Sequence, residues 1–171
     1  MCEHISRAVT AHTGSSLSKQ NGKLFVDVVW YNNIRMIVEI NNSQRIADIK
    51  DAFHAAYPFL QLEFFSRPHE WGKPSSITSR IGEDKLIAEI RTVQGVAAME
   101  IHSWHTTGLV EQEFGKIFGL YIQVFRRDGS DWVQTAGTDT RTLEEQNEAG
   151  RNASQELMDG TNHSFNRENP A

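Results

Sequence analysis

Cysteine, proline and long apolar runs are scarce in this chain of 171 residues. The single cysteine, Cys2, excludes an internal disulfide framework and any zinc site built from several thiolates. The longest apolar runs, such as residues 28–31, fall far short of the roughly 20 residues that a membrane-spanning helix needs. With 12 glycines, 4 prolines and 39% hydrophobic residues, the composition is that of a globular protein.

The charge balance is acidic, with 22 Asp and Glu against 17 Lys and Arg and a formal net charge of −5. A domain of that sign repels phosphate backbones, and the densest basic spot, Arg126-Arg127, is followed at once by Asp128. We therefore expect no nucleic-acid partner. Residues 1–22 lack the apolar segment of a signal peptide, so we expect a cytoplasmic protein that does not associate with membranes.

The chain divides into three parts by composition. Residues 1–22 and 151–171 are small, polar and without apolar period, which predicts a disordered leader and a disordered tail. Residues 23–150 alternate short apolar runs with amphipathic stretches, which predicts a single α+β domain.

Within that domain, alternating apolar residues predict strands at 24–31, 35–40, 60–64, 99–103, 122–124 and 132–135. Asn32-Asn33 is a suitable tight turn between the first two strands, and Asp128-Gly129 is a strong signal for a second hairpin. Helical periodicity appears between Ser43 and Pro58, over 83–93 and over 109–118, where Gly119 ends the pattern. Thr142 begins a capping-box pattern for a last short helix.

The strands carry polar residues on one side, at Glu39, Glu63, Glu100 and Gln123 among others. Strands buried on both faces would read as continuous apolar runs. The pattern therefore predicts an α+β fold with a two-layer mixed sheet and helices on one face, of ferredoxin-like or β-grasp-like kind. The other face of the sheet would be solvated or covered by a partner.

An internal repeat appears when the chain is shifted by about 61 residues. Val-Glu-Ile at 38–40 then falls on Met-Glu-Ile at 99–101, and with one residue of slip Gln61-Leu62 falls on Gln123-Val124. We interpret this as a duplicated β-α-β unit, although any two such units of similar length look alike.

Two groups of residues are candidates for a site. The first is the connection over 66–82, which carries Arg67, His69, Glu70, Trp71 and Lys73 within seven positions. Connections of this length often bind ligands. Here the two cations could hold an anion, His69 and Glu70 could move a proton, and Trp71 could stack on a ligand.

The second group is His102 and His105, at the end of a predicted strand. Positions three apart on a strand point to opposite faces, so these histidines could share a metal only if a turn begins at once. We expect solvent-edge histidines there and no metal site. No Walker loop, no dinucleotide-binding glycine motif and no nucleophile elbow is present, so no cofactor is expected either.

Two functions remain open. The first is a non-catalytic protein-binding or adaptor domain, which would engage a protein partner or a second copy of itself through the polar sheet face or the 66–82 connection. The alternative is a small enzyme or ligand sensor with a pocket under that connection, in which His69 and Glu70 meet His102 or His105. The polar block 132–147 reads mainly as a structural corner between a strand and a helix, and less readily as a recognition edge.

Overall fold

The computed structural model of the protein describes residues 12–20, 23–31, 34–70, 72–95 and 97–165. The chain order of its elements is β1 (His12–Gln20), β2 (Lys23–Tyr31), β3 (Arg35–Ile40), α1 (Ile46–Ala56), β4 (Leu60–Phe65), the 3₁₀ turn η1 (Ile77–Ser79), α2 (Ile87–Ile90), β5 (Ala97–His102), α3 (Thr107–Glu113), the π-helical turn η2 (Phe114–Phe118), β6 (Tyr121–Asp128), β7 (Asp131–Gln134) and α4 (Leu143–Phe165). The predicted α+β class is confirmed.

The described strands form antiparallel sheets with the orders β1-β2, β3-β5 and β4-β6-β7, rather than one mixed sheet. The predicted hairpin between 24–31 and 35–40 is wrong, because β2 pairs with β1 while β3 pairs with β5. The turn positions 32–33 lie outside the described residues. Pairing β3 with β5 places the apolar faces of both strands over one core. The free energy gained by burying this surface cannot be read from short-range turn signals.

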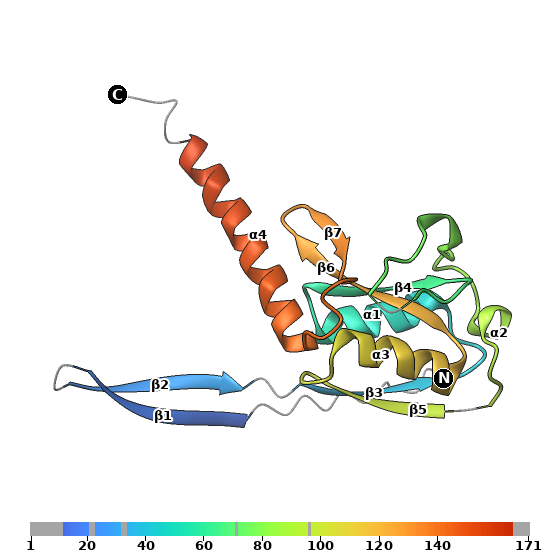
Figure 1. Cartoon of the computed structure of the whole chain (residues 1–171), viewed down its shortest axis with the longest axis horizontal. Helices are drawn as coiled ribbons and strands as arrows, with labels where there is room; N and C mark the ends of the chain where they lie inside the picture. The colour runs from blue at the N-terminus through green and yellow to red at the C-terminus, as the bar shows by residue number, and fades with distance from the viewer. Residues whose placement is uncertain (1–11, 21–22, 32–33, 71, 96, 166–171) are drawn as a thin grey trace.

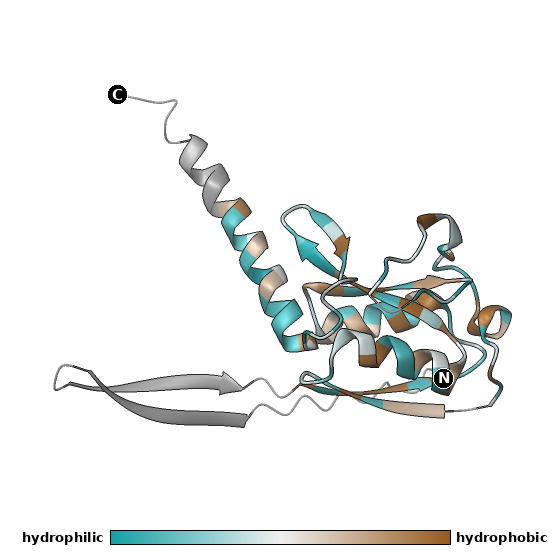
Figure 2. Ribbon diagram, viewed as in Figure 1, coloured by the Kyte–Doolittle hydropathy of each residue, from teal (hydrophilic) through white to brown (hydrophobic). Residues whose placement is uncertain are grey.

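One core holds the domain together. It gathers buried side chains from β3, α1, β4, β5, α3, η2 and β6, together with Leu143 at the start of α4. Figure 1 shows α3 between the β3-β5 pair and the β4-β6-β7 sheet. The hydrophobic residues in Figure 2 gather where these layers face one another, whereas the coloured part of α4 is mainly hydrophilic.

The two principal sheets differ in how they are covered. In the β3-β5 pair, every second residue faces the core, and the opposite face is exposed at Arg35, Ile37, Glu39, Ala98 and Glu100. We call these five residues the outer face. Strands β4 and β6 are instead covered on both sides. Glu63 and Gln123 are thus buried, at 2% and 0% exposure, and do not lie on a solvated face as expected.

Helix boundaries follow local signals in most places. Thr142 accepts a hydrogen bond from the Glu145 N–H while the Glu145 carboxylate accepts one from the Thr142 N–H, so the predicted capping box is present. Gly119 ends η2 in the left-handed conformation. The helix predicted over 83–93 is reduced to the single turn of α2. The structure also continues α4 to Phe165 and places β1 at His12–Gln20, within the segments that we assigned to tail and leader.

The strands that the sequence shift aligns are paired with each other. Val38 lies opposite Met99 in the β3-β5 register, and Leu62 lies opposite Val124 in the β4-β6 register. The entries to the helices match as well: two backbone bonds near the start of α1 and α2 recur near the start of α3 and α4. These bonds are Ile46 N to Lys85 O (3.0 Å) and Ile87 N to Gln44 O (2.9 Å), then Thr107 N to Arg141 O (3.1 Å) and Leu143 N to His105 O (2.9 Å).

Candidate functional site

The connection over 66–82 lies across the side of the β4-β6-β7 sheet that the sequence pattern predicted to be solvated. Ser75 is held there by Gln134, whose side chain accepts from the Ser75 N–H at 2.7 Å and donates to the Ser75 carbonyl at 3.0 Å. The Ser75 hydroxyl donates to Gln123 at 3.3 Å. Further along, the Asp139 carboxylate accepts from the Gly72 N–H at 2.9 Å. These bonds fix the connection from β6, from β7 and from the segment that leads to α4.

The central contact of the site joins His69 to Glu111 of α3. Nε2 of His69 lies 3.3 Å from one oxygen of Glu111, and the other oxygen accepts from the Gln123 side chain at 2.7 Å and from the Val124 N–H at 2.8 Å. The side chains are 15% and 5% exposed. The Glu111 carboxylate therefore satisfies a backbone N–H of β6 and anchors the connection with the same group.

We infer that this pair shares a proton. Nδ1 of His69 lies 3.0 Å from the carbonyl of Glu70, so that nitrogen must carry a hydrogen, and Nε2 must either donate to a carboxylate or accept from a carboxylic acid. Hydrogen bonding to Glu111 raises the pKa of His69 to about 9. Burial raises the pKa of the Glu111 carboxyl. Both directions keep a proton between the two groups through neutral pH.

The other predicted residues of the connection lie near the surface. Arg67 is exposed, and its side chain has no hydrogen-bond or ion-pair partner among the described residues. The exposed carboxylate of Glu70 pairs with Lys73, so it is the backbone of Glu70 that contacts His69, not its side chain. Trp71 lies outside the described residues. The suggested proton transfer between the side chains of His69 and Glu70 is therefore replaced by sharing between His69 and Glu111.

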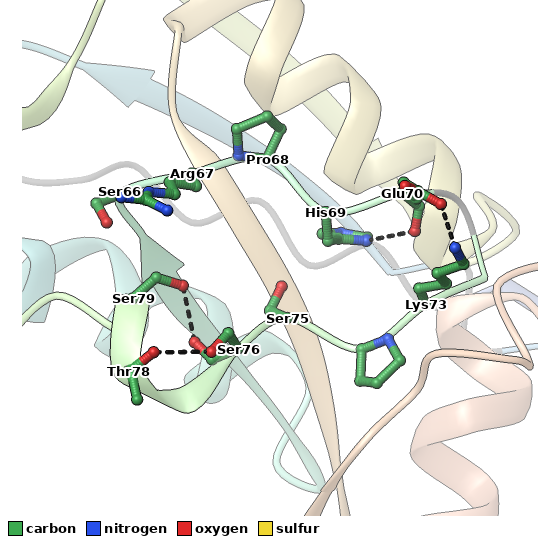
Figure 3. A pocket seen from close by; sticks show the side chains of 11 residues that line it. Ser66, Arg67, Pro68, His69, Glu70, Lys73, Ser75, Ser76, Thr78 and Ser79 are labelled. Carbon is green, nitrogen blue, oxygen red and sulfur yellow. Dashed lines mark hydrogen bonds and ion pairs between the residues drawn. The ribbon is translucent and has the colours of Figure 1, made fainter.

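A cavity of about 450 Å³ lies beneath this stretch of chain. Figure 3 shows the segment 66–70 along one side and residues 73–79 along the other, with His69, Glu70 and Lys73 at one end and Ser66 and Arg67 at the other. A second hollow, of about 280 Å³, lies on the α3 side of His69 and is lined partly by Glu111 and Tyr121. His69 thus forms a wall between two concave surfaces.

His102 and His105 belong to a separate cluster beyond the end of β5. The rings of His102 and Trp104 are stacked at 5.1 Å with an angle of 19°, and Trp104 meets His105 edge to face at 4.2 Å. Nε2 of His102 contacts Glu100 at 3.2 Å. Burial, and then the nearby His102, lowers the pKa of His105. No hydrogen bond, ion pair or ring contact joins this cluster to the described residues of the 66–82 connection.

Neither group is arranged as a metal centre. In the part of the chain that the structure describes, no set of three His, Cys, Asp or Glu side chains could hold an ion. None of the described helices is long and apolar enough to span a membrane. No family model matches the chain, and the searches of curated proteins and of solved structures found no match.

Glu111, Gln123 and Asp139 were not among the predicted site residues. Glu111 sits beside Val110 on the stripe of α3 that faces the core, where a carboxylate requires partners. A carboxylate at a core-facing helix position was the feature of the sequence that could have identified Glu111. The partners themselves come from the connection and from β6, and nothing in the local pattern identifies them.

Proposed function

We propose that the protein is a non-catalytic binding module that engages a protein partner through the outer face of the β3-β5 sheet and the adjoining His102–Trp104–His105 cluster. The observation that carries this proposal is the exposure of Trp104. Its side chain is 58% exposed although its ring packs against the rings of both His102 and His105. Large aromatic side chains that are exposed but already ordered are favoured as anchors of protein interfaces, because little conformational entropy is lost on binding.

The outer face indicates the chemistry of the partner. Ile37 is 45% exposed and offers an apolar surface on β3, in register with Glu100 of β5. Arg35 and Glu100 pair with each other, so their charges are largely matched within the sheet. The carboxylate of Glu39 has no such partner among the described residues. A complementary protein would therefore place apolar side chains against Ile37 and Trp104 and a basic side chain near Glu39.

The His69–Glu111 pair supports a non-catalytic role rather than chemistry. Its polar atoms are engaged with Glu70, Gln123 and Val124, and within the described chain no serine, threonine or cysteine side chain is hydrogen-bonded to either residue. A nucleophile within hydrogen-bond reach of a base is the usual signature of covalent catalysis. A second candidate function, a ligand sensor, is favoured by the cavity under the 66–82 connection.

Four further parts of the proposal have indirect support. We infer that the domain is a duplicated β-α-β unit, since the strands aligned by the sequence shift pair with each other and the helix-entry bonds recur. A ferredoxin-like or β-grasp-like origin is consistent with that arrangement. A cytoplasmic setting is supported by the single cysteine, and the net charge of −5 disfavours nucleic acid as the partner.

The test is affinity capture from the host with matched variants, quantified by mass spectrometry. Wild type, Trp104→Ala, Ile37→Glu and the control Ile77→Ala are compared, because Ile77 is 78% exposed but lies in η1, outside the outer face. We expect at least one protein to be retained by wild type and the control and lost from both other variants. If no captured protein depends on Trp104 and Ile37, the proposal is wrong.

Self-association is resolved by sedimentation of the same set. A concentration-dependent dimer that Trp104→Ala and Ile37→Glu abolish would replace the partner with a second copy of the chain.

A further inference from the structure

The cavity under the 66–82 connection has a lining dominated by hydrogen-bond donors. Five of its side chains carry hydroxyl groups, and Arg67, His69 and Lys73 add nitrogen donors. Its one carboxylate, on Glu70, is already paired with Lys73. A lining of this kind suits an anion with several oxygen acceptors and does not suit a metal cation, which would need free carboxylates or carbonyls.

The charges in the lining leave one cation in surplus. Lys73 is neutralised by Glu70, and His69 is matched by Glu111 at 3.3 Å. Arg67 has no hydrogen-bond or ion-pair partner among the described residues, and in Figure 3 it lies beside Ser66 at one end of the cavity. A guanidinium presents parallel N–H groups that match two oxygens of a tetrahedral anion, so Arg67 is the natural first contact.

The hydroxyl groups add further donors. The Ser76 and Thr78 hydroxyls are 2.9 Å apart, so one donates to the other and the second hydroxyl keeps its hydrogen for a ligand. The Ser66 hydroxyl has no hydrogen-bond partner in the part of the chain that the structure describes. By contrast, Ser79 donates to the Ser76 carbonyl at 2.7 Å and helps to hold the turn.

The walls of the cavity are fixed before any ligand arrives. The Ser66 N–H donates to the Ser79 carbonyl at 2.8 Å, and the Ile81 N–H donates to the Phe64 carbonyl at 2.8 Å, which ties both ends of the segment to the end of β4. The middle is held by Ser75 on Gln134. Preorganised donors lose little entropy on binding.

We propose that this cavity binds a phosphoryl group, as inorganic phosphate or as a phosphate monoester, through the guanidinium of Arg67 and the hydroxyls of Ser66, Ser76 and Thr78. The volume of about 450 Å³ exceeds what the anion alone requires, so the remainder of an ester fits beside Pro68 and Pro74. The site is independent of the outer face, and either proposal can fail without the other.

The test is a titration of the full chain, followed by amide chemical shifts at constant ionic strength. The probes are inorganic phosphate and phenyl phosphate, with chloride as the background salt. We expect saturable shifts that are concentrated within 66–79. Tighter binding of phenyl phosphate would identify an ester as the ligand, whereas equal or weaker binding would identify free phosphate.

Matched variants decide whether Arg67 carries the interaction. Arg67→Gln should weaken binding at least about tenfold, the cost of one charge-assisted contact of about 1.4 kcal/mol. Arg141→Gln is the control, because Arg141 is also exposed and its side chain also lacks a partner among the described residues, but it does not line the cavity. The double variant Ser76→Ala with Thr78→Val should weaken binding while leaving Arg67 in place.

Three results would overturn the proposal: no saturable shifts with either probe, shifts spread evenly over the chain, or equal weakening by Arg67→Gln and Arg141→Gln. Spectra of each variant without ligand show whether it is folded, so a loss of binding is not mistaken for a loss of structure.

Discussion

The His69–Glu111 pair makes the stability of the protein depend on pH in a direction that can be worked out. In the unfolded chain a histidine loses its proton near pH 6.5, whereas in the fold His69 holds it to about pH 9. A pKa that is higher in the fold stabilises it fully below the unfolded value, and this contribution disappears as the pH rises through the folded value. The relevant window therefore runs from pH 6.5 to pH 9.

The size of this pH-dependent stabilisation follows from the difference between the pKa values of His69 in the folded and the unfolded chain. A difference of about 2.5 in pKa corresponds to at most about 3 kcal/mol of unfolding free energy. We expect about 1 to 2 kcal/mol, because the imidazole is 15% exposed and water screens part of the interaction. The comparison is His69→Gln, whose amide can still donate to Glu111 but does not titrate.

The assay is urea unfolding of wild type and His69→Gln at intervals between pH 6.5 and pH 9. The difference between their unfolding free energies should shrink by about 1 to 2 kcal/mol as the pH rises, because wild type alone loses the His69 contribution. Glu111→Gln should remove the same dependence, since His69 then has no carboxylate to retain its proton. If the unfolding free energies of wild type and His69→Gln change in parallel with pH, the reasoning about the shared proton is wrong.

Three further predictions concern stability and are measured by urea unfolding. Gly119→Ala should cost about 3 kcal/mol, because its φ is +66° and a Cβ would collide with Thr92, whereas Gly137→Ala, with φ +85° and open space, should cost only about 1 to 2 kcal/mol. Phe53→Ala should cost about 3 to 5 kcal/mol, because the ring is fully buried in the core. Glu63→Ala should cost about 3 kcal/mol, because it leaves the ammonium and guanidinium groups that now bind this carboxylate without their buried partner.

Each of these has a result that would contradict it. Equal losses for Gly119→Ala and Gly137→Ala would show that the close approach to Thr92 is unimportant. A loss for Phe53→Ala no greater than that for the exposed control Ile77→Ala would contradict its place in the core. Glu39→Ala is the exposed control for Glu63→Ala and should change the unfolding free energy by about 0.5 kcal/mol or less. Equal losses for these two variants would contradict the buried role of Glu63.

Much of the local structure could be predicted from the chain. Strands β3 and β5, helix α1 and the Asp128-Gly129 hairpin depend on neighbours within a few residues, where apolar period and turn chemistry act directly. The prediction of a helix over 83–93 is wrong because a distant segment competes for its backbone. Its apolar residues suit a helix, but the N–H of Ile87 bonds the Gln44 carbonyl near the start of α1, and only the single turn of α2 remains.

The sequence predicted only part of the candidate site. The spacing of polar residues between Arg67 and Lys73 marked the connection, and His69 is less exposed than Arg67, Glu70 and Lys73. The grouping with His102 and His105 is not present, because β5 carries those residues into their own cluster with Trp104. Glu111 becomes a partner of His69 only when α3 has packed beside β6.

The sequence by itself therefore determined the α+β class, the position of most strands, and the residues that must face a core, because these follow from periodicity and turn chemistry along a short stretch. The tertiary structure alone decided that β3 pairs with β5, that the 66–82 connection covers Gln123, and that His69 meets Glu111. Those outcomes depend on the total free energy of packing segments that are distant in the chain, and a carboxylate in the core is tolerated only where such a distant partner arrives.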